Sequence, residues 1–209
     1  MKKGIAILIF LVLIAASAFA EGFSLKAGGG LILDLSFHNG SSSSAADSYE
    51  GYSYLKFGGY GFFDATFVEA DISIVYYSMT SVTKKRTGYL DDDWSGTAAI
   101  SFSIMAKLPI GLRSITVFPL IGINYNLVLN FSNTSGMTLV STGDFNQFGI
   151  LAGGGFDFFF SRALFLRTEA LFTLRFAGGT MKNMASTTPG GDTTLGMGPR
   201  VKTGIGYRF

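Results

Sequence analysis

Apolar and polar residues alternate along long segments of this chain, and this alternation limits the folds that the chain can adopt. In residues 23–37 the odd positions are apolar or glycine, whereas the even positions include Lys26, Asp34 and Ser36. Because side chains of a β-strand point to opposite faces in turn, a period of two predicts strands with one apolar and one mixed face. Residues 67–78 and 164–176 repeat the pattern. These runs exceed the length of an average strand, which is about five or six residues.

The whole chain contains eight candidate strands of this kind, separated by alternating long and short connections. The strands are predicted at residues 23–37, 52–64, 66–78, 95–108, 115–130, 145–160, 163–176 and 194–209. The long connections, 38–51, 79–94, 131–144 and 177–193, are rich in Ser, Thr, Gly, Asn and Asp, and the short ones lie near Ala65, Pro109 and Arg162. An up-and-down sheet with this alternation gathers its long loops at one end. The sequence therefore predicts an all-β fold, an eight-stranded antiparallel up-and-down transmembrane β-barrel.

A soluble barrel also fits a period of two. A lipocalin-like calyx turns its apolar face inward, whereas a transmembrane barrel turns its apolar face to lipid. The predicted strands are long enough to cross an apolar band of about 25 Å, the height of the lipid-facing belt of such barrels. Aromatic residues gather near the strand ends, and only 14% of all residues are charged while 48% are hydrophobic. These features favour the transmembrane barrel over the calyx.

The last predicted strand carries a further signal of membrane insertion. Val201, Thr203, Ile205, Tyr207 and Phe209 share one face, and the strand ends in an aromatic residue. This pattern resembles the terminal strand of outer-membrane barrel proteins, and the chain as a whole resembles the small barrels of the OmpA/OmpX/OmpW type. The resemblance implies localisation in the outer membrane, contact with its lipid, and Ile205, Tyr207 and Phe209 as an assembly signal for the barrel-assembly machinery. We also expect a monomer.

The N-terminal segment predicts export. Lys2 and Lys3 precede an apolar run at residues 4–20 that ends in Ala18-Phe19-Ala20. A basic start, an apolar centre and an A-x-A end are typical of a cleaved secretory signal peptide. We expect residues 1–20 to be the signal peptide and residues 21–209 to form the barrel domain. The formal net charge of +2 equals the charge of these two lysines, so nothing in the balance indicates nucleic acid as a partner.

The mixed face of the strands would line the lumen of the barrel, and it carries many of the charged residues. By position they are Lys26, Asp34, Lys56, Glu69, Asp71, Lys107, Asp157, Arg167, Glu169, Arg175, Arg200, Lys202 and Arg208. Buried charges are costly unless they are paired or hydrated. We therefore expect an ion-pair cluster made of Glu69, Asp71, Arg167, Glu169, Arg200 and Lys202, with Glu169 next to Arg200 or Lys202. The alternative is a polar conduit gated by the same pairs.

Few residues suit catalysis or metal binding. The chain has no Cys and a single His, which argues against thiolate sites and a histidine-rich metal centre. The glycine clusters at 28–30, 58–61 and 153–155 lack the Gly-Lys-Ser/Thr that follows in a phosphate loop. His38 precedes serines 41–44 and Asp47, the residue types of a lipid-modifying enzyme, but a flexible Ser-rich loop explains them more simply. We expect no catalytic residue, no metal and no cofactor.

Residues 84–86 are basic and residues 91–93 acidic, and both are predicted to lie in one long loop. We interpret them as a solvated loop stalk in which the basic and acidic side chains attract each other; a contact with a divalent ion or lipopolysaccharide is the alternative.

The features together favour a non-enzymatic outer-membrane barrel with a plugged lumen and four surface loops, in a structural or adhesion-type role. A narrow OmpW-like channel for small apolar molecules is the alternative, and a lipid-modifying outer-membrane enzyme is a third hypothesis. The sequence does not specify the ligand of the loops.

Overall fold

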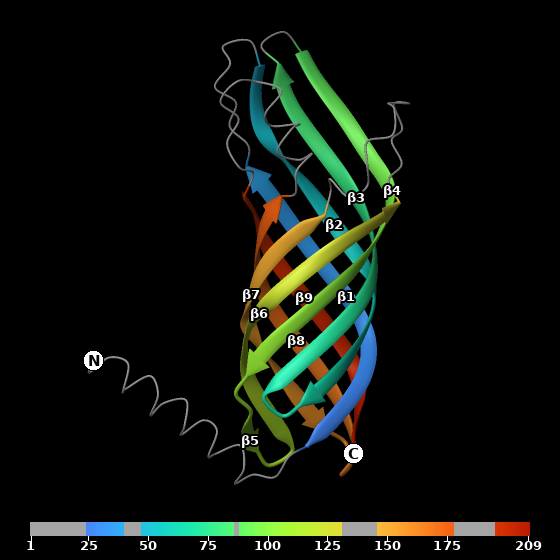
Figure 1. Ribbon diagram of the computed structural model, residues 1–209, viewed down its shortest axis with the longest axis vertical. Helices are drawn as coiled ribbons and strands as arrows, with labels where there is room; N and C mark the ends of the chain where they lie inside the picture. Colours follow the sequence, from blue (N-terminus) through green and yellow to red (C-terminus); the bar gives the residue numbers. More distant parts are fainter. Residues whose placement is uncertain (1–23, 40–46, 86–87, 131–145, 178–194) are drawn as a thin grey trace, which may run out of the picture.

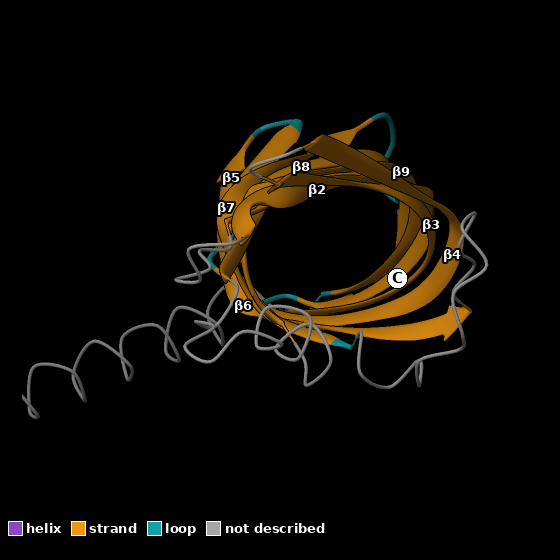
Figure 2. Ribbon diagram, turned by 90° about the horizontal axis from the view of Figure 1, so that it is seen from above, coloured by secondary structure: helices purple, strands orange, loops and turns teal. Residues whose placement is uncertain are grey.

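The computed structural model describes residues 24–39, 47–85, 88–130, 146–177 and 195–209, and these form an antiparallel β-barrel. The strands are β1 (Leu25–Asn39), β2 (Asp47–Ala65), β3 (Val68–Lys85), β4 (Gly88–Lys107), β5 (Ile110–Leu112), β6 (Ile115–Asn130), β7 (Gln147–Phe159), β8 (Leu164–Ala177) and β9 (Leu195–Arg208). Neighbouring strands pair in the order β4-β3-β2-β1-β9-β8-β7-β6-β5, and β4 also pairs with β6. This last pairing closes the eight long strands into the ring that Figure 2 shows from above.

The eight predicted strands and their antiparallel pairing are confirmed, with β5 as an added three-residue piece in the connection between β4 and β6. The prediction of a long loop at 79–94 is wrong. β3 continues to Lys85 and β4 begins at Gly88, and β2 likewise begins at Asp47 instead of residue 52. Thr and Val are frequent in residues 80–83, and these β-branched residues favour strands even where the composition is polar.

β2, β3 and β4 extend beyond their neighbours at one end of the barrel. The last pair between β1 and β2 is His38 with Tyr52, and the last pair between β4 and β6 is Ala98 with Asn130. Figure 1 shows the three strands rising together above this level. We call this end the far end, and we call the opposite end, with the short connections at residues 66–67, 108–114 and 160–163, the turn end.

Side chains alternate across the barrel wall, with large apolar groups outside and charged groups inside. Ile74 and Ile121 on the outer surface are 66% and 62% exposed, whereas Arg167 inside the ring is 0% exposed. A lipocalin-like calyx has the opposite arrangement, so the structure excludes that alternative. Within the described residues no helix is long and apolar enough to cross a membrane.

Inward-facing glycines make room for aromatic rings at the turn end. A Cβ atom at Gly206 would lie 2.7 Å from Cε2 of Phe165, and one at Gly28 would lie 2.7 Å from Cε1 of Phe62. The rings of Phe62 and Phe165 are in contact, with 6.2 Å between their centroids and an angle of 54° between their planes. A side chain at either glycine would push a ring out of this arrangement, which explains the choice of residue.

Gly206→Ala should destabilise the refolded barrel by about 1–3 kcal/mol, the usual cost of overpacking a filled interior. The measurement is the urea dependence of folding in lipid vesicles, followed by the heat-dependent shift in gel mobility. Gly111→Ala is the matched control, because a Cβ at Gly111 meets no atom within 4 Å. Equal stability of the two variants would contradict the role given to Gly206.

Candidate functional site

Arg167 of β8 is the centre of the main cluster of buried charges in the lumen. Its Nε and Nη2 donate to the two carboxylate oxygens of Asp157 at 2.7 and 2.8 Å. Nη1 donates to Glu69 at 2.6 Å, and Nη2 also donates to Asp64 at 2.6 Å. All four side chains have no exposed surface. One guanidinium thus binds carboxylates of β2, β3 and β7. The bonds to β2 and β3 cross the lumen, whereas Asp157 of β7 is the residue paired with Arg167 on the neighbouring strand.

Aromatic rings surround the same guanidinium. Cζ of Arg167 lies 4.3 Å from the ring centroid of Phe62, 5.2 Å from that of Phe118 and 5.3 Å from that of Phe165. Cation–π attraction of this kind grows when water is excluded, as it is here. The rings also fill the space between the ion pairs, so the cross-section at Arg167 is occupied by side chains.

Lys202 of β9 joins a second set of carboxylates to the first. Its Nζ lies 2.5 Å from Glu169 and 2.9 Å from Asp71. It also lies 3.6 Å from Oε1 of Glu69, which belongs to the Arg167 group as well. Glu69 therefore links Arg167 and Lys202. A substitution at either residue changes the electrostatic surroundings of the other through this shared carboxylate.

Two further lysines complete this network at the turn end. Lys107 of β4 is paired with Asp64 and lies 3.7 Å from Glu69. Lys26 of β1 donates to Asp157 at 2.8 Å. With these contacts the network includes side chains from seven of the eight long strands, namely β1, β2, β3, β4, β7, β8 and β9.

A separate charged group lies nearer the far end and is centred on Asp34 of β1. Arg175 and Arg200 both donate to this carboxylate, Arg200 through Nε at 3.0 Å and Nη2 at 2.8 Å. Arg175 also donates to Oγ of Ser36 at 2.7 Å, and Nη2 of Arg200 to Oδ1 of Asn124 at 3.3 Å. A single carboxylate therefore holds two guanidinium groups, whereas five carboxylates share the network at the turn end.

Uncharged polar side chains line the lumen beside this second group, and several of their atoms have no hydrogen-bond partner. Asn124 donates to Ser101 at 2.6 Å and to Ser103 at 3.2 Å. The amide of Asn126, Oγ1 of Thr173 and Nε of Arg175 are buried without a partner among the described residues. The far half of the lumen is thus polar, and like the turn end it contains buried polar atoms without a hydrogen-bond partner among the described residues.

The structure brings together five of the six residues predicted for the ion-pair cluster and separates the sixth. Glu69, Asp71, Arg167, Glu169 and Lys202 lie in the network at the turn end, whereas Arg200 belongs to the Asp34 group. Of the two partners considered for Glu169, the structure selects Lys202.

Sequence reasoning missed one lumen residue. Arg208, predicted to face the lumen, is paired with Lys26 and lies at the turn end as an exposed residue whose Cζ is 4.8 Å from the ring centroid of Phe159. Its guanidinium donates to the main-chain oxygen of Arg162 at 2.5 Å, so it lies outside the ion-pair network. Asp64, the last residue of the predicted strand 52–64, is fully buried and bonded to Arg167. Its even position in β2, shared with Lys56, was the signal that could have identified it.

The remaining candidate sites fall mostly outside the residues whose side chains are described. Serines 41–44 lie in the segment 40–46, and of His38 the structure gives only its backbone pairing with Tyr52 and Gly196. The backbone register places Asp91 opposite Val82 and Asp93 opposite Thr80, while Lys84 pairs with Tyr89. The acidic and basic runs are therefore not directly opposite each other in the hairpin. No group of three or more potential metal ligands occurs among the described residues.

Comparison with known proteins identifies the fold. No protein-family model and no curated protein sequence matches this chain. The outer membrane protein OprG from Pseudomonas aeruginosa is similar with a TM-score of 0.54 at 15% identity, over 90% of this chain and 96% of OprG. Outer Membrane Protein W of E. coli gives 0.38 at 13% identity, over 87% and 98% of the two chains. The likeness to OprG confirms the predicted fold, that of a small outer-membrane β-barrel protein.

Arg167→Met should destabilise the folded barrel by about 3–5 kcal/mol, because it leaves the carboxylates of Asp64, Glu69 and Asp157 without their main partner. Glu169→Ala should cost less, since Lys202 keeps Asp71 at 2.9 Å. The measurement is equilibrium unfolding in urea with lipid vesicles. Arg162→Met, at an exposed turn residue, is the control. If Arg167→Met were no less stable than this control, the central place of Arg167 would be refuted.

Proposed function

We propose that this protein is a non-enzymatic integral outer-membrane barrel whose lumen is closed by its own ion pairs and whose far end presents a contact surface. The observation that carries the proposal is the bonding of Arg167 to Asp64 of β2 and Glu69 of β3 across the lumen, in addition to Asp157 of the neighbouring strand β7. An eight-stranded barrel has an interior about wide enough for its own side chains. Bonds across such an interior leave no room for a steady aqueous pore.

The outer surface supports a position in lipid. Large apolar side chains project from every long strand, for example Leu31, Ile104 and Ile205, which are 69%, 58% and 62% exposed. A soluble protein rarely exposes so continuous an apolar surface. In a bilayer the same surface is covered by lipid, and the closed ladder leaves the paired backbone groups satisfied. The export signal predicted at residues 1–20 and the likeness to OprG in fold support the outer membrane as this bilayer.

The assembly signal is supported by the arrangement of the last strand. Ile205, Tyr207 and Phe209 point outward from the barrel and are 62%, 48% and 75% exposed. The rings of Tyr207 and Phe209 meet edge to face with centroids 5.2 Å apart. An exposed apolar row of this kind is available for recognition before lipid covers it, which is what the barrel-assembly machinery would require.

The contact surface at the far end is supported by the extension of β2, β3 and β4 above the ring. We infer that this sheet and the segments 40–46, 86–87, 131–145 and 178–194 lie outside the cell and provide a structural or adhesion-type function.

A narrow channel is the second candidate, and the far half of the lumen is the observation that favours it. Asn126 and Thr173 have buried polar atoms without a hydrogen-bond partner among the described residues, and water or a polar solute would bond such atoms. For a solute to pass, the Arg167 network would have to open. The plugged barrel and the narrow channel therefore differ only in whether the lumen is closed at the Arg167 network.

Reconstituted protein should give no steady porin-sized conductance in a planar bilayer, because the Arg167 network closes the lumen. Single-channel recording at symmetric salt measures this, with a large trimeric porin reconstituted in parallel as the positive control. Stable openings of the wild-type protein would favour the channel and would make Arg167 and Lys202 its gate.

Orientation can be tested with single cysteines, since the natural chain contains none. A cysteine replacing Gly88, beside the tip of the β3–β4 hairpin, should react with an impermeant thiol reagent on intact cells. Cysteines replacing Leu33, Ile72 and Phe172 should be shielded by lipid, and one replacing Arg162 should react only after the cells are opened. Labelling of the Arg162 position alone on intact cells would reverse the proposed topology.

A further inference from the structure

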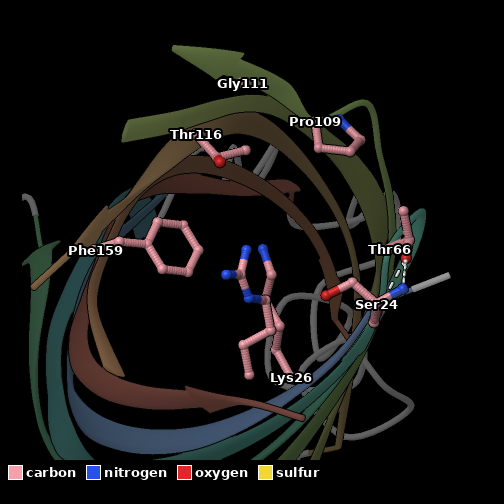
Figure 3. A pocket seen from close by; sticks show the side chains of 8 residues that line it. Ser24, Lys26, Thr66, Pro109, Gly111, Thr116 and Phe159 are labelled. Carbon is pink, nitrogen blue, oxygen red and sulfur yellow. Dashed lines mark hydrogen bonds between the residues drawn. The ribbon is translucent and has the colours of Figure 1, made fainter. Parts of the chain in front are cut away.

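A cavity of about 150 Å³ opens at the turn end and borders the ion-pair network of the lumen at Lys26. Its walls come from several strands and turns, and the residues that matter here are Ser24, Lys26, Thr66, Thr116, Phe159 and Arg208. Figure 3 shows Thr116 and Phe159 along one wall and Ser24 and Thr66 on the other, with Lys26 between them. The cavity is therefore a built recess between strands and not a groove on the apolar belt.

Two cations border this cavity and share one aromatic ring. Nζ of Lys26 lies 5.5 Å from the ring centroid of Phe159, and Cζ of Arg208 lies 4.8 Å from the same centroid. Lys26 is balanced by Asp157 on its inner side. Arg208 donates to the main-chain oxygen of Arg162, and it has no carboxylate partner among the described residues. Among the described residues no acidic side chain lines the cavity, so the described lining carries an excess of positive charge.

Hydroxyl groups complete the donor set. Oγ of Ser24 is buried and has no hydrogen-bond partner within the described part of the chain. The position of Ser24 is fixed by Thr66, whose Oγ1 accepts from the Ser24 main-chain nitrogen at 2.8 Å and donates to its oxygen at 3.0 Å. Thr66 keeps this clamp although its φ angle is 61°, a value that is costly for a β-branched residue. The unpartnered hydroxyl of Ser24 is thus held at the edge of a positively charged cavity.

We propose that this cavity binds a phosphate group. A guanidinium, an ammonium and a hydroxyl that approach from different strands suit an anion with oxygens in several directions, more than a planar carboxylate. Exposed apolar residues at the same end, including Ile110, Leu112 and Phe160, place the cavity beside the lipid-facing belt. A phosphate can therefore arrive from two sources, the headgroup of a phospholipid or free phosphate in solution.

The test is a ³¹P NMR titration of the refolded chain in an uncharged maltoside detergent. One arm adds inorganic phosphate, and the other adds dihexanoylphosphatidylglycerol below its critical micelle concentration. Saturable binding in either arm supports the site, and the arm with the tighter binding identifies the source. Arg208→Gln should weaken that binding about tenfold, as the loss of a charge-assisted hydrogen bond does, and Ser24→Ala should weaken it by a smaller factor.

The matched control is Arg162→Gln, which removes the same charge from an exposed residue at the same end that does not line the cavity. It should bind as tightly as the wild type. Equal weakening in Arg162→Gln and Arg208→Gln would reduce the effect to general charge and overturn the proposal, as would the absence of saturable binding in both arms. Glu21→Gln tests whether a carboxylate of the chain itself, three residues before Ser24 in the sequence, is the occupant. A much tighter binding by that variant would assign the cavity to Glu21 and also overturn the proposal.

The titration does not measure conductance, so the binding result is independent of whether the lumen is plugged. A barrel without channel activity can bind phosphate at the turn end, and a barrel with channel activity can fail to bind it. The thermal stabilities of Arg208→Gln and Arg162→Gln are compared as a control. Equal stabilities would show that a loss of binding in Arg208→Gln does not arise from unfolding.

Discussion

Closure of the sheet by the pairing of β4 with β6 is the constraint on which the rest of the structure depends. The pairs run from Ala98 with Asn130 to Lys107 with Leu120, and they join the two ends of the strand order. A closed ladder satisfies the paired backbone groups without water, which is the condition for a β-structure in lipid. Closure with eight strands also fixes a narrow interior, so every inward side chain must find its partner within that interior.

The inside of this barrel is consequently a charged core and not an apolar one. Gly28 and Gly206 admit the rings of Phe62 and Phe165, these rings contact the guanidinium of Arg167, and Arg167 binds carboxylates from three strands. The position of the rings depends on the glycines, and the position of the guanidinium depends on the rings. We therefore expect replacement of Gly28 or Gly206 to disturb the ion pairs of Arg167, although neither glycine contacts Arg167.

The period of two was sufficient to predict which residues face inward, but not which of them meet. It placed Glu169, Arg200 and Lys202 on one face, and the backbone register then decided among them: Glu169 is opposite Lys202, whereas Arg200 is opposite Asp34. Register depends on the stagger of every pair around the ring, and no local pattern in the sequence records it. The predicted loop at 79–94 failed for a related reason, because composition alone does not show that two paired strands continue beyond the ring.

The two charged groups of the lumen give its two halves different capacities. Near the far end, Asp34 holds two guanidinium groups and neighbouring polar atoms lack partners, so a solute entering there could be bonded by Asn126 or Thr173. At the turn end, passage requires Arg167 to release three carboxylates, and stranding a buried charge costs several kcal/mol. If the lumen is closed as proposed, a solute that enters from the far end meets these polar groups before it meets the Arg167 network. We propose that this order of sites favours retention at the far end over transfer across the barrel.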